Sequence, residues 1–330
     1  MSIQTKDYEG GAAPGWMVWS ALWVVYIVWG STYLAIRVVV ETLPPLLAAG
    51  ARFFLAGAIL YTVIALRKGF AAIKVSKREL GASALVGAAL LLGGNGLVSL
   101  AEQEVSSSLA ALIIASTPLW VILLRKLAGD TISRGTLVGV AIGFAGVAML
   151  VLPGGESNGA AVGGLVMLVI AAASWASGSF FSSRLPLPRD PFVSTAAQMV
   201  TGGLVLVVAG LATGETSGLD PSEFSGASLG AFAYLVTVGS LFAFTCYVWL
   251  LQNAPISKVA TYAYVNPVIA IFLGWLILSE SITTSILVGA AVIVSSVAFI
   301  VSKESATKKP EADEADAPAD AALAGASSSG

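Results

Sequence analysis

The stretch MVWSALWVVYIVWGSTYLAIR, residues 17–37, carries no charged side chain before its last residue, Arg37. An α-helix of about 20 apolar residues is as long as the hydrocarbon core of a bilayer is thick. This stretch is therefore predicted to be a transmembrane helix. Residues 1–15 are polar and lack the basic start of a cleavable signal, and the apolar run after them is too long for one. We expect residues 1–15 to form a cytoplasmic N-terminal tail.

Similar apolar runs continue along most of the chain. Hydrophobic residues make up 57% of the 330 residues and charged residues only 11%, whereas about a quarter of the residues in a water-soluble domain are charged. The sequence therefore predicts an all-α integral membrane protein. Its ten transmembrane helices are expected at residues 17–37, 44–66, 80–101, 106–126, 135–152, 160–182, 191–212, 229–252, 258–279 and 284–302. Residues 303–330 are rich in Ala, Ser and acidic residues, which predicts a disordered cytoplasmic tail.

The distribution of Lys and Arg predicts which loops face the cytoplasm. All of the 17 Lys and Arg residues except Arg37 and Arg52 lie in the terminal tails or in and beside alternate loops. The other loops carry acidic residues instead, such as Glu215 and Asp220. Because cytoplasmic loops are enriched in Lys and Arg, both termini are expected in the cytoplasm. We interpret the chain as a multi-pass protein of the bacterial cytoplasmic (inner) membrane.

The chain contains an internal repeat. SLAALIIASTP at 108–118 aligns with SKVATYAYVNP at 257–267 with an offset of 149 residues, and each segment ends in proline. Further on, DTISRGTLVG at 130–139 aligns with ESITTSILVG at 280–289 with an offset of 150 residues.

The repeat divides the chain into two halves of five helices, residues 16–152 and 153–302. An odd number of helices means that the second half enters the bilayer from the opposite side, so the halves are inverted. Inverted repeats place a substrate site at their interface and allow its two sides to open alternately. The fold is thus predicted to be two inverted five-helix repeats.

Three stretches resemble EamA-type members of the drug/metabolite transporter superfamily. They are YIVWGSTYLAIRVVVETLPPLLAAGARFFLAGAIL at 26–60, GGNGLVSLAEQ at 93–103 and TYAYVNPVIAIFLGWLILSESIT at 261–283. The resemblance extends over residues 16–302 and implies ten helices, an inverted repeat, a central cavity and the efflux of metabolites, amino acids or drugs. It does not imply which solute is carried.

Polar and aromatic side chains within the predicted helices are candidates to line the solute path, because lipid disfavours polar groups at depth. Trp29 and Tyr33 share one helical stripe with Tyr26 and Arg37. The alternative is an interfacial aromatic belt with Arg37 extended toward water. The predicted substrate-binding residues are Trp29, Tyr33, Asn95, Trp175, Tyr262 and Asn266. Further candidates are Trp120, Tyr247 and Tyr264. For Asn95, a hydrogen bond between helices is an equal alternative.

Arg52 and Glu102 are predicted to form a charge network near the outer side. Arg52 lies inside the second predicted helix, where a charge needs a partner or water. It could pair with Glu41, Glu102 or Glu104, contact an anionic solute, or extend toward the membrane surface.

Pro118 and Pro267 occupy matching positions of the repeat. A proline inside a spanning helix frees a backbone carbonyl group and bends the helix. We predict that both prolines act as gating hinges; bends without motion are the alternative.

The function predicted from these features is export of small metabolites, amino-acid-like or drug-like solutes, by alternating access through a central cavity. A second hypothesis is an exchanger of organic anions such as sugar phosphates, which would need several cations facing the cavity. A third is a membrane enzyme, which would need a nucleophile with a base or a carboxylate pair at depth. The spanning segments offer neither, so no catalytic residue is predicted.

The chain contains no His and a single Cys, Cys246, so we expect no metal site and no cofactor. The expected partners are a small-molecule solute and the lipid bilayer; nucleic acid is not expected, and we interpret the protein as a monomer. Because no acidic residue lies in the middle of a predicted helix, the sequence favours downhill transport or exchange over coupling to protons through Glu102.

Overall fold

The computed structural model describes residues 14–151, 162–217, 219–254 and 256–315, and this part of the chain is helical without any β-strand. The α-helices are α1 (Gly15–Val39), α2 (Pro45–Lys68), α3 (Lys77–Gly87), α4 (Leu97–Ala101), α5 (Ser107–Ile114), α6 (Thr117–Leu127), α7 (Arg134–Val151), α8 (Val162–Ser182), α9 (Pro191–Ala212), α10 (Gly226–Tyr234), α11 (Ala243–Asn253), α12 (Ile256–Val259), α13 (Tyr262–Leu278) and α14 (Thr284–Ala315). Two π-helical segments, η2 (Ala88–Gly96) and η4 (Leu235–Phe242), and two short 3-10 helices, η1 (Phe70–Ile73) and η3 (Pro221–Glu223), complete the set.

Nine helical segments of the described chain are long and apolar enough to cross a membrane. Three of them are composite: α3 continues through η2 into α4, α5 is followed by α6, and α10 continues through η4 into α11. The tenth apolar helix is α13, which has 17 residues and follows the short helix α12. These ten segments correspond to the ten predicted helices, and the prediction of an all-α membrane protein is confirmed.

Large apolar side chains cover the outside of the bundle. Leu66, Val208 and Ile277 are among the most exposed, with 78%, 63% and 59% of their surface accessible. A water-soluble protein rarely exposes apolar surface on this scale. The outside of the bundle is therefore suited to contact with lipid acyl chains.

Glycines allow the helices α2, α3 and α9 to touch backbone to backbone. A Cβ atom placed on Gly203 of α9 would lie 2.6 Å from the backbone nitrogen of Phe54 and 2.9 Å from the carbonyl oxygen of Gly50, both in α2. A Cβ atom on Gly202 would lie 2.8 Å from the carbonyl oxygen of Gly87 in α3. Small residues of this kind are the usual means of packing helices closely in membranes, where the hydrophobic effect between helices is missing.

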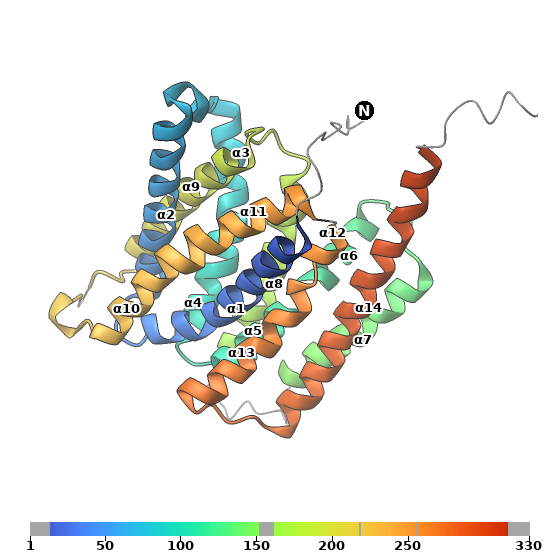
Figure 1. The fold of residues 1–330 in the computed structure, drawn as a ribbon. Helices are drawn as coiled ribbons and strands as arrows, with labels where there is room; N and C mark the ends of the chain where they lie inside the picture. The colour runs from blue at the N-terminus through green and yellow to red at the C-terminus, as the bar shows by residue number, and fades with distance from the viewer. Residues whose placement is uncertain (1–13, 152–161, 218, 255, 316–330) are drawn as a thin grey trace, which may run out of the picture.

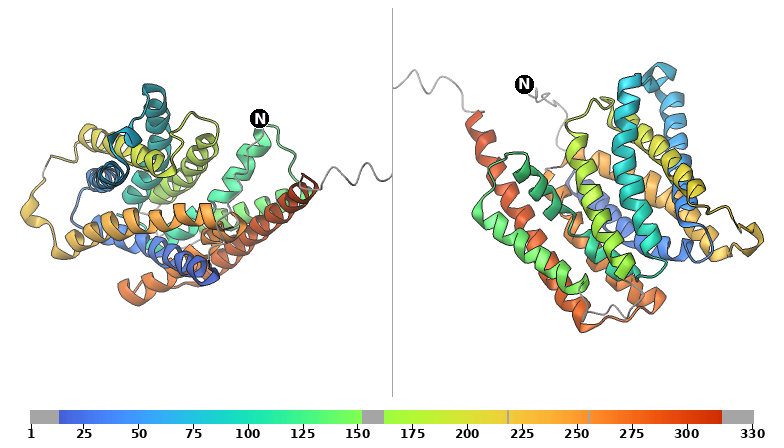
Figure 2. Two further views of the ribbon diagram at one scale, coloured as in Figure 1. Left: turned by 45° about the horizontal axis from the view of Figure 1, so that its top comes forward. Right: turned by 180° about the vertical axis from the view of Figure 1, so that it is seen from behind.

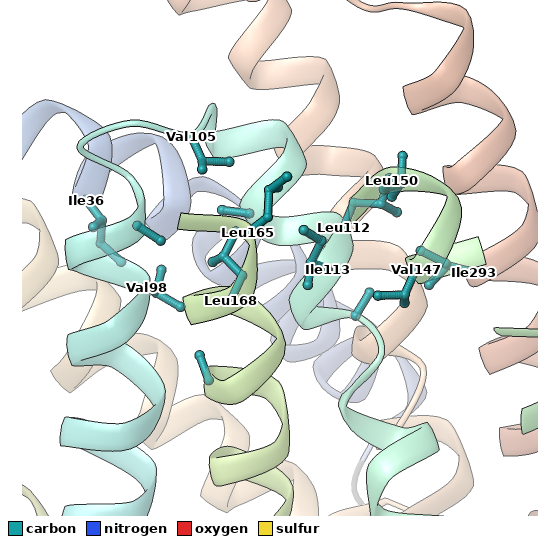
Figure 3. Packing of buried hydrophobic residues seen from close by; sticks show 14 of the residues in the cluster. Ile36, Val98, Val105, Leu112, Ile113, Val147, Leu150, Leu165, Leu168 and Ile293 are labelled. Atoms are coloured by element: carbon teal, nitrogen blue, oxygen red, sulfur yellow. The ribbon is translucent and has the colours of Figure 1, made fainter. Parts of the chain in front are cut away.

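The largest buried cluster surrounds α5 and α8. Leu112 and Ile113 of α5 and Leu165 and Leu168 of α8 are fully buried and face one another in Figure 3. The same cluster includes Val105 from the α4–α5 connection. The bundle is therefore closely packed up to the side that carries this connection, which is the predicted outer side.

Loops that are predicted to share a side of the membrane also contact each other. In Figure 1 the α2–α3 connection and the end of α14 lie at the top, and the α13–α14 connection lies at the bottom. At the top, Lys68, the last residue of α2, forms a 2.7 Å ion pair with Asp190 before α9. At the opposite side, Glu280 binds the start of α5, and Glu215 accepts hydrogen bonds from the first N–H groups of α2. The pairing of loops agrees with the predicted alternation of sides.

Asp190 also begins α9 as its N-cap. Its carboxylate accepts hydrogen bonds from the N–H groups of Phe192 (2.9 Å) and Val193 (3.4 Å), and Pro191 follows at the first helical position. Partial burial alone would raise the pKa of Asp190, but these hydrogen bonds and the one from Lys68 lower it below its ordinary value.

Helix α14 extends further than the sequence suggested. It continues to Ala315, past the predicted boundary at residue 302, so residues 303–315 are helical in this structure, whereas disorder was expected from residue 303. This segment is rich in Ala, Glu and Lys, which are strong helix formers, and it directly continues a membrane-spanning helix. The rest of the predicted tail, and residues 1–13 and 152–161, lie outside the described residues. Figure 2 shows α14 lying along α7.

Two unusual backbone features occur in both halves. Gly129 (φ +96°) and Ser279 (φ +54°) have left-handed conformations, and each directly precedes one of the aligned acidic residues, Asp130 and Glu280. Each half also has a π-helical segment inside its third span, η2 in the first and η4 in the second. These pairs support the predicted repeat; its inverted arrangement stays a prediction.

Candidate functional site

Four aromatic rings from three spans meet inside the bundle. Trp29 of α1 lies 4.9 Å from Tyr247 and 6.1 Å from Phe244, both of α11, and 5.3 Å from Tyr262 of α13, measured between ring centroids. Tyr247 and Tyr262 are 5.7 Å apart. We refer to these four residues as the aromatic cluster. In Figure 1, α1 lies between α11 and α13 and contacts both.

Close packing of α1 on α13 holds the aromatic cluster in place. A Cβ atom on Gly30 would lie 2.8 Å from Ile269 and 3.1 Å from the carbonyl oxygen of Asn266. One turn earlier, the hydroxyl groups of Tyr26 and Thr261 are hydrogen-bonded to each other. The predicted residues Trp29, Tyr262 and Asn266 therefore lie together.

Asn266 adds an unsatisfied polar atom one turn along α13 from Tyr262. Its side chain is 9% exposed, and its Oδ1 atom has no hydrogen-bond partner among the described residues. A buried amide oxygen without a partner costs about 1–3 kcal/mol. A bound solute with a hydrogen-bond donor could remove that cost.

Arg52 of α2 lies near the aromatic cluster, on the side of η4. Its side chain is 6% exposed, and Nε donates a 2.9 Å hydrogen bond to Oγ of Ser240 in η4. Its Nη2 atom lies 3.6 Å from the position of a Cβ atom on Gly239, whose carbonyl oxygen accepts a hydrogen bond from Nε1 of Trp29 (3.3 Å). The guanidinium group of Arg52 and the ring of Trp29 thus both lie close to Gly239 of η4.

The predicted contact between Arg52 and Glu102 is absent from this structure. Arg52 of α2 faces η4 and bonds a serine hydroxyl group, whereas both carboxylate oxygens of Glu102 lack a hydrogen-bond partner in the described part of the chain. The sequence predicted that both residues lie near the same side of the membrane. In the structure, the Arg52 side chain contacts η4, whereas Glu102 lies near Arg37 of α1.

Glu102 lies near side chains of α1 and of the α13–α14 connection. Nη1 of Arg37 donates a hydrogen bond to the backbone carbonyl oxygen of Glu102, and the carboxyl group is within electrostatic range of Arg37, Glu280 and the predicted residue Tyr33. The Glu102 side chain has no solvent-exposed surface.

Glu280 closes the predicted outer side next to Glu102. Its Oε1 atom accepts hydrogen bonds from the N–H and the hydroxyl group of Ser107, both 2.8 Å long. Its Oε2 atom accepts the N–H of Ser108 (3.0 Å) and the Ser108 hydroxyl group. We refer to this contact between Glu280 and the two serines as the outer gate. A carboxylate is stabilised at the N-terminus of a helix by the free N–H groups there.

Asn95 and Trp175 lie apart from the residues of the aromatic cluster in the chain, in η2 and α8. Asn95 lies half-buried in η2, and the ring of Trp175 in α8 lies 2.7 Å from the position of a Cβ atom on the adjacent Gly94. No ring contact within the described residues joins Trp175 to the aromatic cluster. Trp120, a further candidate, instead contacts Phe144 with ring centroids 4.8 Å apart.

The two predicted hinge prolines lie in different surroundings. The helix is interrupted between Ile114 and Thr117, so Pro118 stands in the first turn of α6. Pro267 lies inside the continuous helix α13, and the break in that span falls earlier, between α12 and α13. The aligned prolines therefore differ in local conformation, while their role as hinges stays a prediction.

Sequence reasoning did not identify Phe244 or the serines of the outer gate. Phe244 precedes Tyr247 by three residues, a spacing that places both on one helix face, and this signal could have identified it. Ser107 and Ser108 had no such signal, because their partner Glu280 lies more than 170 residues away in the chain.

The arrangement suits binding rather than chemistry. Among the described residues, no group of three His, Cys, Asp or Glu side chains could hold a metal ion. The aromatic cluster offers apolar rings beside one guanidinium group and one amide group. These groups can hold a small solute that has an apolar body and a polar head.

Comparisons with known proteins agree with this architecture. The EamA-like transporter family matches residues 16–152 and 162–302. The uncharacterized inner membrane transporter YedA of Escherichia coli K12 is 39% identical over 259 residues, which are 78% of this chain and 81% of YedA. The uncharacterized transporter YoaV of Bacillus subtilis is 24% identical over 82% of this chain and 91% of its own.

A solved crystal structure with 18% sequence identity covers 88% of this chain and 97% of its own, with a TM-score of 0.59, and shares the fold. The family match extends over both halves of the chain and over all ten membrane helices. This chain therefore belongs to the EamA-like transporter family and is a membrane transporter, not an enzyme.

Proposed function

We propose that this transporter exports small amphipathic solutes, amino-acid-like metabolites or drug-like molecules, across the bacterial inner membrane by alternating access. The observation that carries the proposal is the aromatic cluster, in which Trp29 contacts three rings from two other spans. Aromatic rings provide a large apolar surface, and their faces attract cations such as an ammonium group.

The polar groups near the aromatic cluster favour a solute that carries both a carboxylate and an ammonium group. Arg52 is a planar donor suited to a carboxylate. The unpaired Oδ1 atom of Asn266 is an acceptor suited to an ammonium group. An amino-acid-like solute could engage both groups while its side chain lies on the rings.

The alternative function is exchange of organic anions. It is disfavoured because the cationic side chains inside the bundle point to different places. Arg52 is a buried cation near the aromatic cluster. Arg37 donates to the backbone of Glu102, and Nζ of Lys258 lies over the ring of Trp19 at 5.2 Å. A phosphorylated solute would need several cations directed at one point.

Alternating access is supported by the repeat and by the closed outer gate. The acidic residues that align in the two halves, Asp130 and Glu280, have different partners, Arg125 in one case and the serines of the outer gate in the other. Such asymmetry between equivalent positions is expected of a transporter with one side closed. The Lys and Arg distribution supports cytoplasmic termini, and the name of the relative YedA supports the inner membrane.

The test is solute flux into liposomes that contain the purified protein, with a panel of labelled amino acids and amphipathic amines. Trp29→Ala should reduce the flux of transported solutes by about two- to tenfold, because the solute loses one aromatic contact of about 0.5–1.5 kcal/mol. Trp16→Ala is the matched control, since Trp16 lies on the same helix and is 71% exposed. Equal flux in the two variants would contradict a solute site at the aromatic cluster.

A further inference from the structure

Glu102 is the most deeply buried charged residue in the described part of the chain. Its side chain has no exposed surface, and neither carboxylate oxygen has a hydrogen-bond partner. The effective cost of burying an ionised group without a partner is several kcal/mol, and such groups in proteins take up a proton instead. The function proposed above does not use this carboxyl group.

The titratable groups around Glu102 compensate a negative charge only in part. From α1, Arg37 brings one positive charge, but it directs its hydrogen bond to the backbone carbonyl oxygen of Glu102, and Tyr33 brings a phenol group. From the α13–α14 connection, Glu280 brings a second carboxylate. Helix α8, which packs on α4, contains no titratable residue, and Arg52 of α2 bonds Ser240.

We propose that Glu102 is a proton-binding site that controls the outer gate. While the gate is closed, the carboxyl group carries one proton. When the gate opens and water reaches Glu102, the O–H bond breaks, the electron pair stays on the carboxylate and the proton passes to the external solution. Closure reverses these steps, so each closure takes up one proton.

The location of Glu102 explains why proton binding and closure are linked. Glu102 lies in the α4–α5 connection, and the outer gate holds the start of α5 directly after it. Closure therefore buries Glu102 and brings it near the carboxylate of Glu280, and both effects favour the protonated form. Because the closed state binds the proton more tightly, lower external pH favours closure, by up to about tenfold per pH unit for one proton.

The first experiment detects the proton directly and does not depend on transport. Infrared spectra of the purified full-length protein at neutral pH should contain the C=O stretch of a protonated carboxyl group. Glu102→Gln should remove this band, whereas Glu223→Gln, at an exposed acidic residue of an outer loop, should leave it unchanged. The absence of the band from the unaltered protein would overturn the proposal, even if Glu102→Gln failed to assemble.

The second experiment links the proton to the gate, and it rests on the proposed alternating access. In a Cys246→Ala background, Val98→Cys is introduced one turn before Glu102, where the side chain is 5% exposed. Its labelling by an impermeant thiol reagent, divided by that of an exposed Asp220→Cys reference at the same pH, should fall as the external pH falls. When Glu102→Gln is added, the labelling of Val98→Cys should be low at every pH. If the labelling depends on pH equally with and without Glu102→Gln, or does not depend on pH when Glu102 is present, Glu102 does not control the outer gate.

The two experiments separate this proposal from the proposed function. If no solute of the panel is transported but the carboxyl band and the pH-dependent labelling are found, the solute assignment fails and the proton site stands. If solutes are transported and the band is missing, the proton site fails alone.

Discussion

Glu280 and Ser107, one in each half of the chain, are joined by two hydrogen bonds of 2.8 Å, from the N–H and the hydroxyl group of the serine to one carboxylate oxygen. This contact attaches the α13–α14 connection to the start of α5. The acidic residue that aligns with Glu280 in the first half, Asp130, instead binds Nε of Arg125 at 2.9 Å. The two halves thus use aligned acidic residues differently, and under the proposed alternating access this contact is expected to change during transport.

Removal of the Glu280 carboxylate should open the outer gate. Hydrogen bonds to a charged group contribute about 1.5–3 kcal/mol each, so Glu280→Ala should shift the balance between closed and open states by at least tenfold. The measurement is labelling of Val98→Cys by an impermeant thiol reagent in the Cys246→Ala background. Glu223→Ala, which removes an exposed acidic residue from another outer loop, should leave labelling unchanged. Equal labelling of the two variants would show that Glu280 is not part of a gate.

The topology predicts which loops react from outside intact cells. Asp220→Cys, in an exposed loop with acidic residues, should react with an impermeant reagent, and Lys77→Cys, in a basic loop, should react only after the cells are opened. Glu215 is unsuitable for this test because its carboxylate holds the N-terminus of α2. The reverse labelling pattern would place the termini outside.

The aligned prolines should act on opposite gates. Pro118→Ala and Pro267→Ala each restore a backbone donor, so solute flux should fall while solute affinity is retained. Because the two halves are predicted to be inverted, the two substitutions should shift the accessibility of introduced cysteines in opposite directions, one toward each side. If both variants shift accessibility alike, or neither does, the prolines are packing features and not paired hinges.

The close contact of α2 and α9 should be sensitive to one methyl group. A Cβ atom on Gly203 would meet backbone atoms at 2.6 and 2.9 Å, which cannot move aside as a side chain can. Gly203→Ala should therefore destabilise the protein by about 1–3 kcal/mol, visible as a lower midpoint of thermal unfolding in detergent. Gly230→Ala is the control, because no atom lies within 4 Å of the added carbon. An equal midpoint in the two variants would contradict backbone contact at Gly203.

By itself, the sequence determined the membrane class, the ten helices and the family. These properties follow from composition and from the length of apolar runs, since a bilayer requires each span to satisfy its own backbone hydrogen bonds. The alternation of charged loops and the repeat were also visible because both depend on residue order along the chain. The spacing of four residues placed Tyr262 and Asn266 on one face of a helix, since helical periodicity gives the face on which a residue lies. Their role in solute binding stays a prediction.

Only the tertiary structure decided which polar groups meet. Arg52 binds Ser240 and not Glu102, the carboxylate oxygens of Glu102 have no hydrogen-bond partner among the described residues, and Glu280 binds the start of α5. Each of these results depends on how helices that are distant in sequence are rotated and tilted against one another. Their rotation is set by packing, such as the backbone contact at Gly203, and periodicity within one helix does not contain that information.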